Sequence, residues 1–224
     1  PFFGYNRGWL LIRGIFGMVA LTMFFYTIQN IPLASATVIQ YLSPVFTVIL
    51  AKFFLKEKVR PIRWVFLAIA FGGIILVKGF DPRVPVIFLI IGGVAAFFAA
   101  VAYFATMKCR ETDHPVAIVL YFHLLAVPIM GTWSYQVWEP IGWTEWGMGM
   151  LIGVLSVFAQ ISMAVAITRE DASIVTPVKY VGAILALLIG MYGFNEHLST
   201  WSIVGIFLVI LGVTLNTVLR RSKT

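Results

Sequence analysis

Long runs of apolar residues alternate with short polar gaps along the whole chain. We count eight runs, at residues 9–28, 34–55, 62–77, 85–107, 116–135, 143–167, 173–192 and 200–219. Each run is close to the ~20 residues that a helix needs to cross a bilayer. A transmembrane β-barrel would instead show segments of about ten residues with alternating hydrophobicity. The pattern therefore predicts eight membrane-spanning helices, antiparallel to their neighbours because the connections are short.

The composition agrees with a chain that lies in lipid. Of the 224 residues, 61% are hydrophobic and 11% are charged, and the mean hydropathy is +0.97. A soluble domain of this length needs many more polar residues to cover its surface. The net charge of +7 is spread over the gaps between the apolar runs. Because no polar domain gathers these charges, we expect lipid around the protein and no nucleic-acid partner.

The basic residues are divided unevenly between the two sides of the predicted bundle. With eight spans both chain ends lie on one side, to which thirteen lysines and arginines are assigned, Arg13 among them, against two on the other. The positive-inside rule makes the side with the chain ends cytoplasmic. Trp133, Trp138, Trp143 and Trp146 cluster at the opposite edge, as in an interfacial aromatic belt. We expect a multi-pass protein of the inner (plasma) membrane with a cytoplasmic C-terminus.

An internal repeat appears when the sequence is shifted by 139 residues, because the second and third runs then fall on the seventh and eighth. Matching residue pairs include Thr37 and Thr176, Tyr41 and Tyr180, Glu57 and Glu196, and Gly73 and Gly212. The two copies enter the membrane from opposite sides, which is typical of secondary transporters. The fourth and fifth runs lack an upstream partner, so an intact repeat predicts about 55 further residues and two further helices before residue 1.

Motifs in both copies extend this picture. Residues 31–77 contain Ser43-Pro44 in mid-helix, Glu57 at a turn and Gly72-Gly73 in the next helix. Residues 172–216 resemble them, with Glu196 at the turn and Gly212 in the last helix. In these features the chain resembles the EamA-type transporters of the drug/metabolite transporter superfamily, and the resemblance covers the whole chain.

The resemblance implies an all-α polytopic membrane protein with ten helices in two inverted repeats of five. Residues 1–79 would then hold the last three helices of the first repeat, and residues 84–221 the complete second repeat. The first two helices of the family fold would lie upstream of the chain. The resemblance also implies transport of amino acids, other metabolites or drugs, but it does not identify a substrate.

Six residues are candidates for binding the substrate, namely Lys179, Gln40, Tyr180, Tyr41, His123 and Gln160. Lys179 is the strongest, because a charge within a span is costly and usually functional. The alternative is that its ammonium group snorkels to the interface. Lys179 precedes a stripe of small residues that should pack inward, and Gln40, its partner in the repeat, precedes an equivalent stripe.

The other candidates have alternatives of similar weight. The hydroxyl groups of Tyr41 and Tyr180 either contact substrate or belong to packed aromatic side chains. His123 and Gln160 lie near the middle of their spans, where each either lines a cavity or makes a hydrogen bond between helices.

The chain lacks the residues that other membrane functions need. The interiors of the predicted spans contain no acidic residue, His123 is their one histidine, and Cys109 is the only cysteine of the chain. An intramembrane enzyme needs paired carboxylates, a metal site or a nucleophile with its base, and a channel needs charged rings or a filter loop. We therefore predict an alternating-access transporter of a small metabolite, amino acid or drug-like compound, without cofactor or metal. A lone lysine in a span favours an anionic or zwitterionic substrate.

Overall fold

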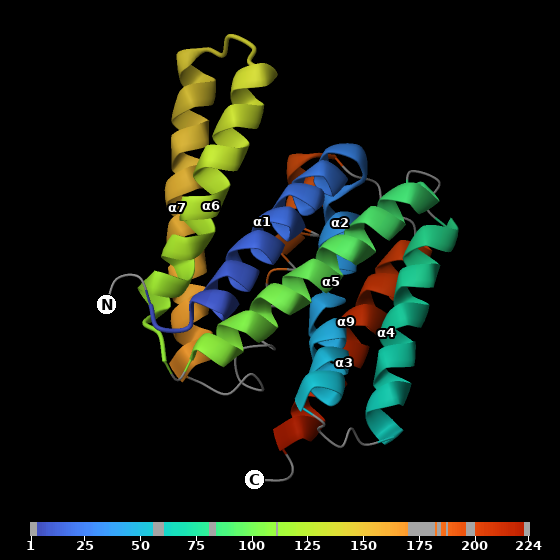
Figure 1. The fold of residues 1–224 in the computed structure, drawn as a ribbon. Coiled ribbons are helices and arrows are strands. Elements are labelled where there is room, and N and C mark those ends of the chain that lie inside the picture. The colour runs from blue at the N-terminus through green and yellow to red at the C-terminus, as the bar shows by residue number, and fades with distance from the viewer. Residues whose placement is uncertain are drawn as a thin grey trace.

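The computed structural model describes residues 4–55, 61–80, 84–110, 112–169, 182, 185–186, 188–195 and 200–221. Within these residues the chain forms helices and no strands. The helices are α1 (Arg7–Asn30), α2 (Leu33–Gln40), α3 (Ser43–Leu55), α4 (Pro61–Phe80), α5 (Val86–Cys109), α6 (Pro115–Gln136), α7 (Trp143–Arg169) and α9 (Thr200–Arg221). Apart from α2 and α3, which follow one another in the same direction, successive helices run up and down through the molecule (Figure 1).

Most of the predicted spans coincide with helices. The first, third, fourth, fifth, sixth and eighth spans correspond to α1, α4, α5, α6, α7 and α9, with ends shifted by a few residues. Four of these helices are long and apolar enough to cross a membrane, namely α1, α5, α6 and residues 143–166 of α7. The seventh span lies largely outside the described residues. The chain is therefore an all-helical, multi-pass membrane protein.

The second predicted span is not one continuous helix, so that prediction was wrong at its centre. α2 ends at Gln40 and α3 begins at Ser43. Pro44 has no N–H, so the carbonyl of Gln40 cannot receive the bond that a continuous helix would give it. The chain tightens there, and the backbone N–H of Leu42 donates to the carbonyl of Ile39 at 3.0 Å. The break lies beside Gln40, which lines the cavity described below.

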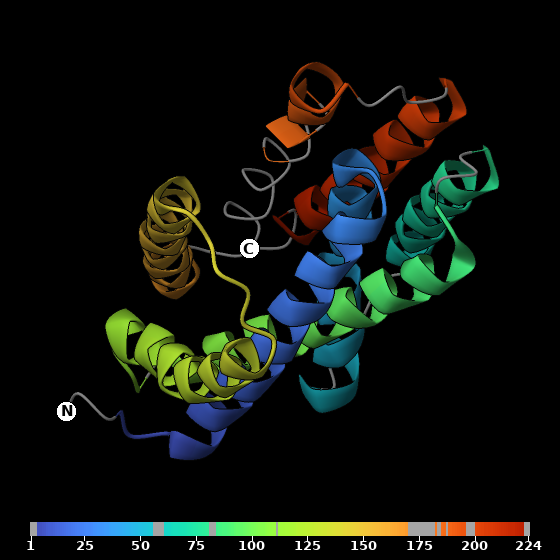
Figure 2. The same cartoon turned by 90° about the horizontal axis from the view of Figure 1, so that it is seen from above.

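Small residues let α1 and α5 pack against each other across the centre of the molecule (Figure 2). Six alanines of α5 are buried, at positions 95, 96, 99, 100, 102 and 105. A Cβ atom on Gly92 would lie 2.9 Å from Cγ2 of Ile39 and 3.5 Å from Cγ2 of Thr27. In lipid, close van der Waals packing of this kind replaces the hydrophobic effect as the main attraction between helices.

The start of α1 is tied to the turn between α5 and α6. The backbone N–H groups of Tyr5 and Asn6 donate to the buried carboxylate of Asp113, the second at 3.3 Å. The hydroxyl of Thr112 donates to the same carboxylate at 2.7 Å. A carboxylate is favourable at a helix N-terminus, where N–H groups lack partners within the helix. This contact fixes where α1 begins. It therefore also fixes the position along the helix axis of each residue in the first turns of α1.

The hairpin of α6 and α7 extends beyond the other helices (Figure 1). Residues 131–155 are all exposed, although most are apolar. Trp138 and Trp146 lie near its tip with ring centroids 5.8 Å apart, and Trp143 is 92% exposed. Exposed apolar side chains over the length of a helix, with tryptophans at one end, are what a surrounding bilayer favours.

α4 packs on α9 through two glycines that are 139 residues apart, the shift of the internal repeat. A Cβ atom on Gly73 would lie 2.5 Å from the carbonyl oxygen of Gly205 and 2.9 Å from the nitrogen of Val209. A Cβ atom on Gly212 would lie 2.6 Å from the carbonyl oxygen of Phe66 and 2.9 Å from the nitrogen of Ala70. Phe66 and Ala70 are the partners of positions 205 and 209 under the same shift. Each glycine therefore contacts equivalent positions on the other helix, and the contact is pseudo-symmetric.

Gly73→Ala should destabilise the protein by about 1–3 kcal/mol, because a methyl group would overlap the backbone of α9. Gly72→Ala is the matched control, since a Cβ atom there meets nothing within 4 Å. It should be neutral or stabilising by up to about 1 kcal/mol, through the higher helix propensity of alanine. Unfolding in mixed detergent micelles measures both values. Equal stabilities of the two variants would contradict the described contact.

Candidate functional site

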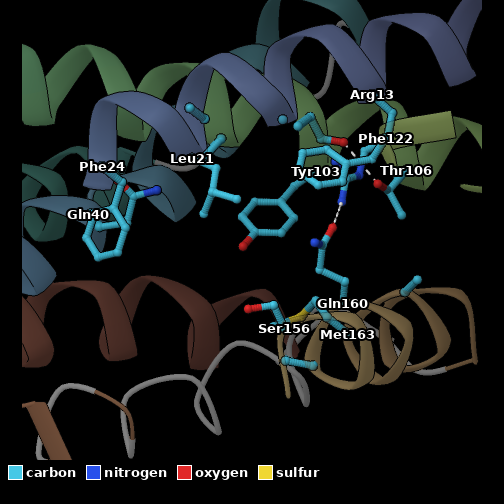
Figure 3. Close-up of a pocket in the computed structure, with 16 residues that line it drawn as sticks. Arg13, Leu21, Phe24, Gln40, Tyr103, Thr106, Phe122, Ser156, Gln160 and Met163 are labelled. Atoms are coloured by element: carbon cyan, nitrogen blue, oxygen red, sulfur yellow. Dashed lines mark hydrogen bonds between the residues drawn. The ribbon is translucent and has the colours of Figure 1, made fainter. Parts of the chain in front are cut away.

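A cavity of about 320 Å³ lies between α1 and α5 on one side and α7 on the other (Figure 3). Small and apolar side chains make up most of its lining. The polar members are Arg13, Gln40, Tyr103, Thr106, Ser156 and Gln160. Ligand sites are typically apolar pockets of roughly 300–1,000 Å³ with a few polar groups that orient the ligand. The cavity is thus of a size to hold a small organic molecule.

Arg13 supplies the charge of this cavity. It is six residues past the start of α1, which is about 9 Å along a helix. Its Nη2 donates to Oε1 of Gln160 on α7 at 3.3 Å, and its Cζ lies 5.4 Å from the ring centroid of Phe122 on α6 (Figure 3). Within the described part of the chain, no carboxylate is within ion-pair distance of the guanidinium.

The side chain of Arg13 is directed away from the near end of α1. Side chains on a helix normally lean toward its N-terminus, and an arginine that snorkels here would follow that direction. The guanidinium lies instead over Gly17, one turn further along, so that a Cβ atom at Gly17 would overlap Nη1. Gly17 therefore makes room for the guanidinium, and Arg13 extends toward the interior of the bundle.

Gln40 lies toward the other end of the cavity, beside Phe24 (Figure 3). Its Oε1 is buried and has no hydrogen-bond partner among the described residues. A buried acceptor without a donor costs about 1–3 kcal/mol. A ligand that donates a hydrogen bond at this end would remove that cost.

Tyr103 and Ser156 also face the cavity. Figure 3 shows the hydroxyl of Tyr103 between α1 and α7, and that of Ser156 on α7, one turn before Gln160. Neither residue was among the predicted site residues. A hydroxyl donates and accepts, so both can adapt to different ligand groups.

The structure brings together two of the six predicted site residues, Gln40 and Gln160. Lys179 and Tyr180 lie outside the described residues. Tyr41 is absent from the lining, and its hydroxyl is directed at Gly182, where a Cβ atom would lie 2.8 Å away. His123 is also absent from the lining, and its Nδ1 lies 2.9 Å from the carbonyl oxygen of Val119 in its own helix.

The assignment of Arg13 to the cytoplasmic edge needs correction, because its guanidinium lines the cavity. The signal was present in the sequence, since Arg13 falls inside the first predicted span. What the sequence could not show was the direction of the side chain. That direction depends on Gly17, Phe122 and Gln160, the last two of which lie on other helices.

These observations define a class of protein, a multi-pass helical membrane protein with a charged internal cavity. Residues 3–79 and 86–218 match the EamA-like transporter family, and the chain belongs to that family. It is therefore a membrane transporter and not an enzyme.

Several characterised proteins are similar to the chain. The pseudopaline exporter CntI of Pseudomonas aeruginosa (strain UCBPP-PA14) is 32% identical over 206 residues, covering 90% of this chain and 72% of the exporter. The riboflavin transporter of Vibrio cholerae is 27% identical, covering 97% of this chain and 74% of its own. The S-adenosylmethionine uptake transporter of Rickettsia prowazekii is 25% identical, covering 94% and 69%.

The fold also matches a crystal structure of another protein, with a TM-score of 0.64 and 20% identity. The match covers 98% of this chain and 79% of the other. At this identity it shows the likeness of the folds alone.

Gly17→Ala should displace the guanidinium of Arg13 from Gln160 without unfolding α1, because the obstructing atom is at the end of a flexible side chain. A double-mutant cycle measures this. In the wild-type background, Gln160→Leu should lower the free energy of unfolding by about 1 kcal/mol. In the Gly17→Ala background, the same substitution should change it hardly at all. Gly8→Ala on the same helix, where a Cβ atom meets nothing within 4 Å, is the control. The same cost in all three backgrounds would contradict the geometry.

Proposed function

We propose that the protein transports a small molecule with an anionic group by alternating access, and that the anion binds at Arg13. Arg13 carries the proposal, because its guanidinium is directed into an internal cavity and has no carboxylate partner among the described residues. A guanidinium stays charged and binds carboxylates through two parallel hydrogen bonds. The protein would lie in the inner membrane with its C-terminus in the cytoplasm.

The opposite end of the cavity favours a zwitterion over a simple anion. The buried Oε1 of Gln40 needs a donor, which an ammonium or amine group of the substrate supplies. Between the two ends the lining is largely alanine, leucine and phenylalanine, which suits an apolar middle. The relatives named above are called transporters of pseudopaline, riboflavin and S-adenosylmethionine, so the same fold accommodates organic molecules of several kinds.

Alternating access requires two halves that move about a shared site. We take residues 1–79 and 84–221 as parts of two inverted repeats in a ten-helix fold. The symmetric contact of Gly73 with α9 and of Gly212 with α4 supports this division. In such an arrangement Lys179 would stand where Gln40 stands in the other repeat, so it would face the same cavity from the opposite side. Tyr180, the partner of Tyr41, would then be directed away from the cavity.

Arg13→Gln should reduce uptake of carboxylate substrates by tenfold to a hundredfold, roughly the worth of a hydrogen bond to a charged group. Proteoliposomes containing the full-length protein would be tested with labelled amino acids, dicarboxylates and S-adenosylmethionine, and with riboflavin as a neutral compound. Arg7→Gln is the matched control, because Arg7 is exposed at the start of the same helix. Uptake of neutral compounds alone, or full activity of Arg13→Gln, would overturn the proposal.

Lys179→Met should reduce the same uptake strongly while expression and insertion persist, because methionine keeps the apolar stem and removes the charge. Arg169→Met, at the membrane edge, should have little effect. If Lys179→Met transports normally, Lys179 snorkels to the interface and the charge at Arg13 serves alone.

The topology predicts that Lys58 is cytoplasmic and Glu145 external. Single cysteines at these positions, in a Cys109→Ala background, would be treated with a membrane-impermeant maleimide on intact cells. The cysteine at 145 should react and the cysteine at 58 should not, because the basic residues gather on the side of position 58. The reverse pattern of labelling would invert the assignment.

A further inference from the structure

We infer that Gln160 is a latch that the substrate opens: its amide oxygen occupies the place on Arg13 that the substrate anion takes, so that binding releases α7 from α1. The inference rests on the proposed function, because it assigns a second role to the same site. It concerns how binding at Arg13 leads to movement of a helix.

α7 is held loosely by its packing. Only 6% of its most apolar window is buried, against 22% in α1, 33% in α5 and 22% in α6. Residues 143–155 are all exposed, and the helix contacts α6 more extensively than α5 (Figure 2). Because so little of α7 is buried against the other described helices, a polar tie to α1 is a large part of what those helices offer to keep it in place.

The tie between α1 and α7 is the hydrogen bond from Nη2 of Arg13 to Oε1 of Gln160, at 3.3 Å. It is long compared with the 2.7–2.9 Å typical of guanidinium and carboxylate. The amide is also neutral and offers one oxygen, whereas a carboxylate offers two and a full charge. A substrate anion therefore competes effectively with Gln160 for the guanidinium.

Phe122 leaves the guanidinium free to change partner. It lies over the cation at 5.4 Å and belongs to α6, a different helix from the one that carries Gln160. A ring over the face of a guanidinium leaves the N–H groups at its edge available. The cation can thus exchange Gln160 for an anion while it keeps its stacking partner.

The exchange of Gln160 for an anion on Arg13 links binding of the substrate to the position of α7. With α7 docked, Gln160 competes for Arg13, so this state binds anions less tightly than a state in which α7 has moved away. A ligand shifts an equilibrium only through such a difference in affinity. Substrate would therefore favour the undocked state, and the cavity, which α7 closes on one side, would open there.

Two substitutions separate the latch from simple packing. Gln160→Leu keeps the volume and removes the acceptor, so α7 should be undocked without any anion. Gln160→Glu supplies a permanent carboxylate, so α7 should stay docked and stop responding to anions. Ser162→Ala, which changes an exposed polar side chain on α7 outside the cavity lining, is the control.

The experiment measures the distance from α5 to α7 by double electron–electron resonance in lipid nanodiscs. Spin labels would replace Ile87 and Phe158, which are 55% and 65% exposed, in a Cys109→Ala background. Acetate is the probe and acetamide its neutral counterpart. Acetate alone should shift the wild type and Ser162→Ala to a new distance, which Gln160→Leu should show without acetate. Gln160→Leu should also bind acetate about tenfold more tightly than the wild type, as expected when one competing hydrogen bond is removed.

A wild type that does not respond to acetate, or a Gln160→Leu variant with the wild-type distance, would overturn the latch. Uptake by Arg13→Gln separates that failure from failure of the proposed function. If uptake needs Arg13 but the distances never change, the latch alone is wrong. If uptake does not need Arg13, the proposed anion site is wrong as well.

Discussion

The guanidinium of Arg13 lies inside a bundle whose composition leaves few polar partners for it, and the candidate site is organised around that constraint. A cation within a membrane helix is costly unless polar or aromatic groups surround it. Here three different helices contribute, through Gly17 on α1, Phe122 on α6 and Gln160 on α7. Asp113, at the turn before α6, fixes the start of α1 and so the depth of the cation.

Close packing of small residues makes this arrangement possible. The buried alanines of α5 let neighbouring helices approach it closely, and the same helix contributes Ala99 and Ala102 to the wall of the cavity. The glycines of α4 and α9 bring those two backbones together elsewhere in the bundle. α7, by contrast, has little packing of this kind, so the protein combines a closely packed α1–α5 pair with a helix that has little buried surface. That combination suits a transporter, in which one part must move against another.

The helices could be predicted from the sequence because a span in lipid is defined by length and hydropathy alone. The break at Tyr41 and Leu42 could not be placed in the same way, although Pro44 indicated a weak point, because proline within a membrane helix either kinks it or interrupts it. The polar residues that line the cavity were harder to predict from the sequence. Gln40 was a candidate as the repeat partner of Lys179, and Gln160 as a polar residue near mid-span, and both line the cavity.

Arg13 was missed because a basic residue near the end of a span normally snorkels toward the water. Its direction depends on contacts between helices, which a single sequence does not reveal. Tyr41, in contrast, was predicted as a site residue but does not line the cavity. It neighbours Gln40 in sequence, but successive residues near a helix end point to different sides, and its hydroxyl is directed at Gly182 and not into the cavity.

Protection of the cavity by substrate tests most directly whether the substrate binds in the cavity beside Arg13. A cysteine at Thr106, which lines the cavity on α5 beside Arg13 (Figure 3), and one at Phe158, which is 65% exposed, would be compared in a Cys109→Ala background. In proteoliposomes, the transported carboxylate should slow alkylation at position 106 at least several-fold and leave position 158 unchanged. Equal rates at position 106 with and without saturating substrate, while transport continues, would show that the substrate passes elsewhere.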